Sequence, residues 1–382
     1  MKNICLLGAT GSIGDSCLDV LMQHKDRFSL YSVAANTNWQ KVAKIVKLFS
    51  VKRICMFDKF AAEKLEQELG VKVLTGLDGL KELASDTHTD IVVNALMGAV
   101  GCLPTLCAIS EGKHVALANK ETMVMAGPVI LDALKENPKA FITPIDSEHN
   151  AIFQCLAGRP KTEVECLEIT ASGGPFREWS LENFEKITLK DALNHPVWSM
   201  GKKITIDSAS MMNKGLEVIE AHFLFNIPYE NIKVVVHPQS MIHSMVQFRD
   251  GSLMAQLGAP DMRIPIQVAL TWPERLALKT NRLDLASLGK FTFFAPDFNK
   301  FRCLSLAFEA GKQGGVLPAM MNAANEVVVD AFLQEKIRFV DIPEFVENVM
   351  QKAPKITSRL TLEDALLADK EARILALEFV SK

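Results

Sequence analysis

Three features are missing from this 382-residue sequence: a block of like charges, a long apolar run and a CxxC pair. The formal net charge is only -3, with both signs interspersed, so nothing indicates an extended surface for nucleic acid or for a membrane. No run approaches the roughly 18 apolar residues of a membrane span. An anionic ligand would therefore have to be bound by a local group of donors.

We expect no targeting peptide, because the N-terminus enters an apolar strand after one lysine and shows no long apolar h-region or small-residue cleavage site. The eight cysteines stand mostly in apolar stretches, as reduced core thiols do. We therefore expect a cytoplasmic protein. With 48% hydrophobic residues, the chain is long enough for two or three hydrophobic cores.

Residues 1–146 alternate β-rich runs with amphipathic segments. Such alternation predicts an α/β fold with a mostly parallel, doubly wound, Rossmann-like sheet. The strand candidates are NICLLG, FSLYSVAA, VKRICMF, VKVLT, DIVVNAL, KHVALA and AFITPI.

The loop GATGSIG, residues 8–14, lies between the first of these strands and a helix that begins near Ser12. Glycine permits a tight turn and the close approach of a pyrophosphate, whose charge the free amides of a helix N-terminus bind. The loop therefore predicts a dinucleotide cofactor.

An acidic residue is absent where an NAD site would need one, because the sequence has no Asp or Glu between Asp26 and Asp58. The second strand instead ends in Asn36, Thr37 and Asn38, with Lys41 as the nearest cation. Neutral donors helped by one lysine can bind a 2′-phosphate. This pattern favours NADPH.

The stretch PIDSEHN, residues 144–150, places Asp146 and Glu148 where a strand passes into a helix. Ligands of doubly wound proteins lie at this edge of the sheet. A helix cap with a favourable acid in its first turn explains the two carboxylates equally well. Partners elsewhere in the chain must decide between a metal site and a cap.

Such partners are offered by residues 205–225, where apolar residues recur at helical spacing from Met211. Asn213 and Glu217 fall on one face of this expected helix, and serines precede it. Hydroxyls, an amide and the Lys214 ammonium suit a phosphate, and a third carboxylate suits Mg²⁺ or Mn²⁺. A solvated helix face is the alternative interpretation. No cysteine or paired histidines with zinc spacing compete for the metal.

Between the two segments, ASGGPF forms an expected anion-binding turn around Ser172. The later NHPVWSMG carries an aromatic and a methionine on a loop interrupted by proline, which indicates either a satellite core or a lid.

The expected domains are an NADPH-binding domain over 1–146, a catalytic domain over 147–275 with a flap at about 172–202, a linker over 276–300 and a helical bundle over 301–382. Asn322, Asn325 and Glu326 in the bundle are candidates for the edge of the site, although we favour capping and surface positions for them.

Seven strings occur together and in order in this chain: GATGSIG, ALANKE, IDSEHNAIFQ, TASGGPF, HPVWSMGKKITIDSASMMNKGLEVIEA, VHPQSMIHSMVQF and GAPDMRIPIQVAL. In this the chain resembles the 1-deoxy-D-xylulose 5-phosphate reductoisomerase family over essentially its whole length. The resemblance implies a homodimer that uses NADPH and a divalent metal (Mg²⁺, Mn²⁺ or Co²⁺). It also implies conversion of the phosphorylated ketose 1-deoxy-D-xylulose 5-phosphate to 2-C-methyl-D-erythritol 4-phosphate in non-mevalonate isoprenoid biosynthesis.

Site residues follow from the same resemblance. It implies that the metal is bound by Asp146, Glu148 and Glu217, and that the catalytic group also includes Lys120, His149 and His243. It implies that the substrate is contacted by Ser147, Ser172, His195, Trp198, Met200, Ser208, Asn213 and Lys214. For the cofactor it implies Thr10, Gly11, Ser12, Ile13, Asn119, Glu121 and Met262, to which we add Asn36 and Asn38 at the 2′-phosphate. Many members carry a basic string at Ala35 to Asn38, so this chain departs from the family there.

Three other classes remain as alternatives. A semialdehyde dehydrogenase would need a catalytic cysteine, for which Cys155 is the nearest candidate, although it falls within an expected helix. A plain alcohol dehydrogenase would not need the phosphate-binding group around 208–214. A non-catalytic dinucleotide sensor would not need three convergent carboxylates.

Overall fold

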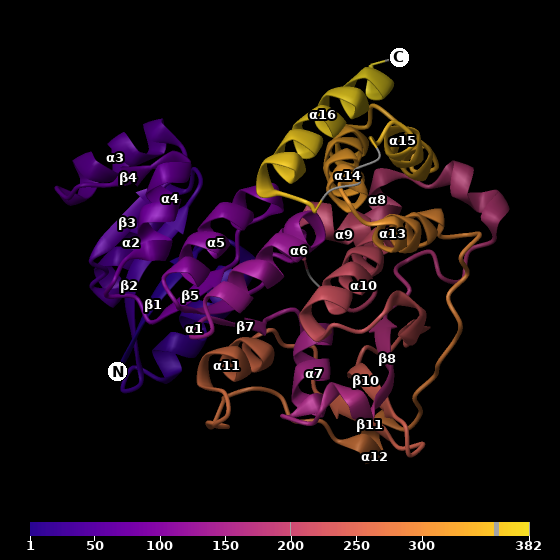
Figure 1. The fold of residues 1–382 in the computed structure, drawn as a ribbon, viewed down its shortest axis with the longest axis horizontal. Helices are drawn as coiled ribbons and strands as arrows, with labels where there is room; N and C mark the ends of the chain where they lie inside the picture. The colour runs from indigo at the N-terminus through magenta and orange to yellow at the C-terminus, as the bar shows by residue number, and fades with distance from the viewer. Residues whose placement is uncertain (199, 355–358, 382) are drawn as a thin grey trace. The chain divides into compact units, whose positions relative to one another are not determined.

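The computed structural model describes residues 1–198, 200–354 and 359–381, which divide into two compact units (Figure 1). The first unit comprises Met1–Thr122, Ile130–Asn150 and Asp261–Thr280, and the second comprises Met123–Val129, Ala151–Pro260 and Asn281–Lys382. Ser199 of the expected flap, and residues 355–358 and 382 of the expected bundle, lie outside the described residues.

The first unit contains a seven-stranded parallel sheet in the order β4-β3-β2-β1-β5-β6-β7, as the alternation predicts. Its order reverses between β1 and β5, which is where dinucleotides bind to such sheets. The strands are β1 (Lys2–Leu7), β2 (Phe28–Ala35), β3 (Arg53–Met56), β4 (Leu74–Thr75), β5 (Ile91–Asn94), β6 (His114–Leu117) and β7 (Phe141–Pro144).

Helices connect these strands (Figure 1). Apolar residues of several of these helices are buried in the same core cluster as the strand residues, as expected for amphipathic helices. The helices are α1 (Ser12–Gln23), α2 (Trp39–Phe49), α3 (Lys59–Leu69), α4 (Gly76–Ser85), η1 (Gly98–Gly101), α5 (Cys102–Ser110) and α6 (Lys120–Glu136), of which residues 123–129 are assigned to the second unit. Helix α7 (Ser147–Leu156) follows β7 and contributes its first turn to the first unit. A further helix, α11 (Arg263–Thr271), joins the unit from much later in the chain.

Helix α11 returns to the first unit because its apolar face completes that unit's core. Ile266, Ala269 and Leu270 are buried in the same cluster as the strand residues, and Thr143 Oγ1 donates a hydrogen bond to the Ala269 carbonyl at 3.2 Å. The expected domain boundaries at residues 146 and 275 did not include this return. Periodicity predicts a helix but not the sheet against which it packs.

The second unit contains a four-stranded sheet in the order β11-β10-β8-β9, in which only β8 and β9 pair in parallel. The strands are β8 (Val164–Ala171), β9 (Ile232–Val236), β10 (Ile242–Phe248) and β11 (Leu253–Leu257). Strand β11 is an edge strand and exposes Leu253, Met254 and Leu257.

The helices of this unit include the expected C-terminal bundle, in which α14 packs against α15 and α16. They are η2 (Lys161–Glu163), η3 (Leu181–Lys186), α8 (Leu189–Ala192), α9 (Lys202–Ala209), α10 (Met212–Phe225), η4 (Tyr229–Asn231), α12 (Leu285–Leu288), α13 (Arg302–Gln313), α14 (Leu317–Leu333), α15 (Asp341–Met350) and α16 (Leu362–Val380). Within the described residues, none of the helices combines the length and apolar character that crossing a membrane requires.

One helix, α9, was not predicted from the sequence. Ser208 lies inside a separate helix, α9, which ends just before Met211 turns into the left-handed conformation with φ of 60°. Helix α10 begins only after this break. The helix expected from Met211 is thus confirmed, and the additional helix α9 precedes it across a sharp corner.

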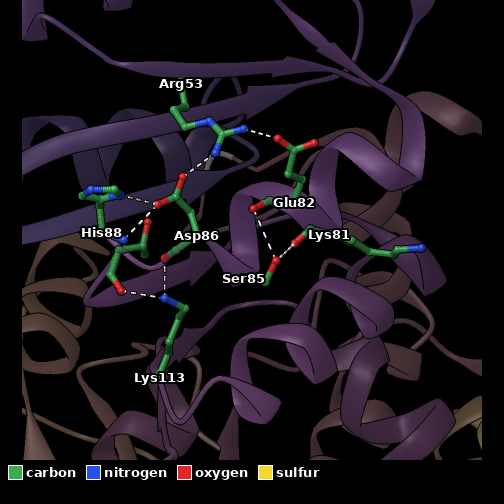
Figure 2. Close-up of polar contacts among 8 residues, drawn as sticks. Arg53, Lys81, Glu82, Ser85, Asp86, His88 and Lys113 are labelled. Carbon is green, nitrogen blue, oxygen red and sulfur yellow. Dashed lines mark hydrogen bonds and ion pairs between the residues drawn. The ribbon is translucent and has the colours of Figure 1, made fainter.

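A polar cluster lies at the amino end of β3, where Arg53 reaches both Glu82 and Asp86 (Figure 2). The Asp86 carboxylate is buried and accepts hydrogen bonds from Arg53 at 2.5 Å and from the His88 backbone at 2.8 Å. Lys113 donates to the Asp86 and Thr89 carbonyls. Burial alone raises the pKa of the Asp86 carboxyl, but the bonds from His88 and Arg53 outweigh it and hold that pKa below its usual range.

The Asp86→Asn variant should lose about 2 kcal/mol of unfolding free energy at neutral pH, because a buried charge partner of Arg53 disappears. The pKa of Asp86 in the folded state lies below the unfolded value of about 3.9. The stability that the Asp86 carboxylate contributes is therefore fully present above about pH 3.9 and is lost as the pH falls through the folded-state pKa. Urea unfolding from pH 3 to 7 should show the two proteins converging at the acidic end. A difference that is constant with pH would contradict this account.

Candidate active site

The glycine loop follows β1 at the reversal of the first sheet. Gly8 has φ of +90°, and a Cβ there would lie 2.3 Å from the carbonyl oxygen of Ala95, just after β5. Only glycine permits this approach of two strand ends. The first turn therefore has the tight geometry that the sequence predicts.

Gly11 serves a different purpose, because a Cβ there would meet only the Gly8 carbonyl, at 3.6 Å. Gly11 and Ser12 are exposed, Thr10 and Ile13 are half-buried, and α1 begins at Ser12. An open glycine backbone beside the N-terminus of a 12-residue helix fits a pyrophosphate. The loop thus fits a dinucleotide, as expected.

Asn36 and Asn38 are exposed at the carboxyl end of β2, the edge where the ribose of a dinucleotide lies. Asn38 caps α2, because its Oδ1 accepts the Lys41 amide at 3.1 Å. The Lys41 ammonium donates to the Thr10 carbonyl at 3.0 Å and pairs with Asp15 at 2.7 Å. Lys41 therefore ties α2 to the glycine loop.

Asn119 is almost fully buried and uses its side chain internally. Its amide donates to the carbonyls of Leu96 and Gly98, at 2.9 and 3.0 Å, and to Glu121 at 3.1 Å. Its Oδ1 caps α6 by accepting the Thr122 amide at 3.1 Å. The Asn119 side chain thus orders the loop after β5.

Met262 and Ile13, two expected cofactor contacts, pack against the same hydrophobic core of the first unit. Met262 reaches that core because it immediately precedes α11. The return of α11 therefore explains how a residue so late in the sequence joins the unit that carries the glycine loop.

The carboxylate pair lies where β7 passes into α7. The Lys120 ammonium, at the start of α6, is 2.5 Å from Asp146 Oδ2, and Ser147 Oγ donates to Glu148 Oε2 at 2.6 Å. Lys120 is buried, whereas the carboxylates are half-buried. The ends of β6 and β7 thus bring together a cation and an acid from separate motifs.

His149 and Asn150 complete this first turn of α7. His149 is fully buried, with its Nδ1 3.8 Å from Asp146 Oδ2. Asn150 donates to the Pro144 carbonyl at 2.8 Å and to the Pro265 carbonyl at 3.2 Å, which anchors the turn to β7 and α11. Two half-buried carboxylates on an anchored turn fit a hard divalent cation, which prefers oxygen ligands.

The third expected carboxylate, Glu217, belongs to the second unit, where its residue is only 1% exposed. Asn213 donates to Glu217 Oε1, and the buried Lys214 ammonium pairs with Oε2. Burial excludes a solvated helix face at Lys214 and Glu217. Because buried charges are costly unless paired, such a cluster is typical of a functional site.

The turn around Ser172 packs directly on the end of α9. Gly174 has φ of +67°, and a Cβ there would lie 2.8 Å from the Ser208 carbonyl oxygen. This contact brings the expected phosphate-binding segments at 172 and 208 together, although they are far apart in the sequence. It requires glycine at position 174.

His195 is hydrogen-bonded on both ring nitrogens. Its Nδ1 accepts the Trp198 amide at 2.8 Å, so the proton resides on Nε2, which donates to Ser172 Oγ at 3.0 Å. Burial lowers the pKa of His195 to about 4, so the ring is neutral near pH 7. Ser172 Oγ also accepts the Gly174 amide at 3.2 Å, so its own proton can point to a ligand.

Of the remaining flap residues, Trp198 lies against β10. Trp198 and Met200 are half-buried, and the Trp198 ring centroid is 6.4 Å from that of the buried His243. This contact links the flap segment to the second sheet.

Sequence reasoning missed one polar group, in which the buried Asp207 contacts the buried Asn325 and the half-buried Lys203. The expected surface positions of Asn322 and Asn325 are wrong, because both residues are fully buried in α14. Two asparagines inside the apolar run of PAMMNAANEVVV were the signal that could have indicated this.

Cys155 offers no support for a semialdehyde dehydrogenase. The residue is buried, and burial raises the pKa of its thiol to about 11. A thiol with so high a pKa is protonated at neutral pH and is a poor nucleophile.

Comparison with known proteins gives family matches along the chain. Residues 4–127 match the 1-deoxy-D-xylulose 5-phosphate reductoisomerase model, residues 142–225 match a C-terminal domain model of that enzyme, and residues 257–375 match the DXP reductoisomerase C-terminal domain model. A curated relative, 1-deoxy-D-xylulose 5-phosphate reductoisomerase of Bacillus subtilis (strain 168), is 51% identical over 98% of each chain.

Two solved structures are also similar. DOX-P reductoisomerase in complex with NADPH, fosmidomycin and magnesium superposes with a TM-score of 0.95 at 40% identity, over 100% of this chain and 98% of that one. 1-Deoxy-D-xylulose 5-phosphate reductoisomerase from Zymomonas mobilis in complex with NADPH superposes with a TM-score of 0.92 at 44% identity, over 99% of each chain. With half of its residues identical to a curated member along nearly its whole length, this chain belongs to the 1-deoxy-D-xylulose 5-phosphate reductoisomerase family.

Proposed function

We propose that this chain catalyses the NADPH- and metal-dependent conversion of 1-deoxy-D-xylulose 5-phosphate to 2-C-methyl-D-erythritol 4-phosphate in non-mevalonate isoprenoid biosynthesis. The observation that carries the proposal is the full-length identity of about half with relatives of that name. A relative bound to NADPH, fosmidomycin and magnesium supports the two cofactors.

In this proposal the first unit binds NADPH. The open loop at Thr10, Gly11, Ser12 and Ile13 takes the pyrophosphate, with Asn36 and Asn38 at the 2′-phosphate. Glu121 and Met262 lie on the cofactor side, and Asn119 acts by holding the loop after β5.

Asp146, Glu148 and Glu217 would hold the divalent cation, Mg²⁺, Mn²⁺ or Co²⁺. Two of these carboxylates now pair with lysines, Asp146 with Lys120 and Glu217 with Lys214. When a cation takes over the carboxylates, Lys120 and Lys214 can turn to a substrate hydroxyl and to the phosphate. His149, behind Asp146, keeps that side of the turn dry.

The second unit would bind the phosphate through Ser172, Ser208, Asn213 and Lys214. His195 contributes as a neutral donor to Ser172 Oγ, which directs the serine proton outward. Lys214 supplies the positive charge. Ser147, beside the metal ligands, would contact a substrate hydroxyl.

When bound, the cation would supply polarisation of the ketose carbonyl and NADPH would supply hydride, so the protein would need no covalent nucleophile. Trp198, Met200 and His243 would cover the substrate and exclude water. Residues 1–146 would act as the cofactor domain, 147–275 as the catalytic domain, and 301–382 as a supporting bundle reached through 276–300.

A homodimer is part of the proposal. The edge strand β11 exposes Leu253, Met254 and Leu257, and an exposed apolar edge strand is a ready site for pairing with a second chain. We also propose a cytoplasmic location, because the eight free thiols suit a reducing compartment.

The purified protein should oxidise NADPH, followed at 340 nm, when 1-deoxy-D-xylulose 5-phosphate and Mg²⁺ or Mn²⁺ are present. Excess chelator should abolish the activity, and Glu217→Gln should lower kcat at least about a hundredfold, since even groups behind metal ligands cost that much. Melting curves establish that the variant is folded. Chelator-resistant turnover, or a normal rate for the variant, would remove the metal assignment.

Lys41→Met tests the cofactor preference. If Lys41 leaves Asp15 for the 2′-phosphate, the KM for NADPH should rise about tenfold while that for NADH stays constant. Lys47→Met, an exposed lysine of the same helix paired with Glu68, is the control. Equal losses with both cofactors would mean that Lys41 only orders the glycine loop.

The double variant Leu253→Lys/Leu257→Lys should halve the molar mass measured by light scattering, because buried like charges oppose pairing at β11. Leu285→Lys, at an exposed leucine on α12, should leave the mass unchanged. A dimer that survives the double variant would place the interface elsewhere.

A further inference from the structure

Asp207 carries a buried carboxylate that the proposed function does not use. The residue is 1% exposed and lies in the last turn of α9, one position before Ser208. Its Oδ2 is 2.6 Å from the Lys203 ammonium on the same helix, and its Oδ1 accepts the Asn325 amide from α14 at 2.8 Å. Both carboxylate oxygens therefore have partners, one local and one from the C-terminal bundle.

The hydrogen bond to Asp207 sets the orientation of the Asn325 side-chain amide. Within the described residues its Oδ1 is buried without a hydrogen-bond partner. A flip of the amide would turn that oxygen toward the Asp207 carboxylate, where two acceptors would repel each other. The amide thus leaves one acceptor unsatisfied in order to donate to Asp207, which indicates a specific requirement at this position.

The end of α9 has little freedom. Ser210 Oγ donates to the Asp207 carbonyl at 3.2 Å, and Met211 follows in the left-handed conformation. On the other side, Gly174 packs so closely on the Ser208 carbonyl that no Cβ would fit. A shift of α9 would therefore move Ser208 and the Ser172 turn together.

We propose that Asp207 is a positioning residue for the phosphate-binding group, and that Asn325 is its anchor in the helical bundle. Asp207 touches no substrate. It holds α9 against α14 so that Ser208, and through Gly174 also Ser172, face the phosphate. The inference rests on the proposed function, which identifies the phosphate site. It implies that the C-terminal bundle contributes to the affinity for substrate.

The test compares Asn325→Ala with Glu326→Gln. Glu326 is the next residue of α14 and binds Arg373 of α16 at 2.6 Å, so its variant weakens the bundle without touching α9. Asn325→Ala should raise the KM for 1-deoxy-D-xylulose 5-phosphate about tenfold, the effect of one hydrogen bond to a charged group, with kcat nearly unchanged. Glu326→Gln should leave both constants as they are.

A general loss of stability would not raise the KM for the ketose while leaving kcat nearly unchanged. The inhibition constant of inorganic phosphate should rise by the same factor as KM, whereas turnover of 1-deoxy-D-xylulose, which lacks the phosphate, should not change. If Asn325→Ala fails to fold, the exchange Asp207→Asn/Asn325→Asp restores a donor and an acceptor between the two positions. It should bind phosphate more tightly than Asp207→Asn alone.

Direct titration with inorganic phosphate in a calorimeter separates this inference from the proposed function. If the unaltered protein binds phosphate but does not turn over the ketose, the proposed function fails, and the ratio of phosphate affinities for the variants still decides the role of Asp207. Equal phosphate affinities in Asn325→Ala and the unaltered protein would overturn the inference. The inference would also be overturned if the exchange variant bound phosphate no more tightly than Asp207→Asn alone.

Discussion

Buried or half-buried carboxylates must have positive partners, and most of the site depends on this constraint. Asp146 pairs with Lys120 across the ends of two neighbouring strands, Glu217 pairs with Lys214 one helical turn away, and Asp207 pairs with Lys203. Each acid would be costly to bury alone. The backbone therefore has to place a lysine beside each of these acids.

In the first unit, the geometry of the parallel sheet brings these charged groups together. All its strands end at one edge, so groups that follow separate strands converge there without long connections. The glycine loop follows β1, Asn36 follows β2, and Lys120 and Asp146 follow β6 and β7. In the second unit the residues proposed to bind phosphate come from the turn after β8 and from α9 and α10. Close packing brings these segments together: the Ser172 turn rests on α9 through Gly174, and α9 rests on α14 through Asp207 and Asn325.

The sequence predicted the sheet, the glycine loop and the carboxylate pair because each depends on short-range patterns. Periodicity, glycine spacing and motif order are visible within a few dozen residues. It did not predict α9 as a separate helix. The break between α9 and α10 lies at Met211, which adopts the left-handed conformation although no glycine there indicates such a turn. Nor did it predict the burial of Asn322 and Asn325, whose polar side chains favour the surface unless a partner is known.

The sequence by itself determined the fold class, the family and the types of residue available for chemistry, because local propensity and motif identity need no partner. Only the tertiary structure decided which groups meet. Asp207 and Asn325 are 118 residues apart, α11 completes a core built from the start of the chain, and the His195 tautomer follows from the Trp198 amide. The physical reason is that a buried polar group is stable only with a specific partner, and long-range packing chooses that partner.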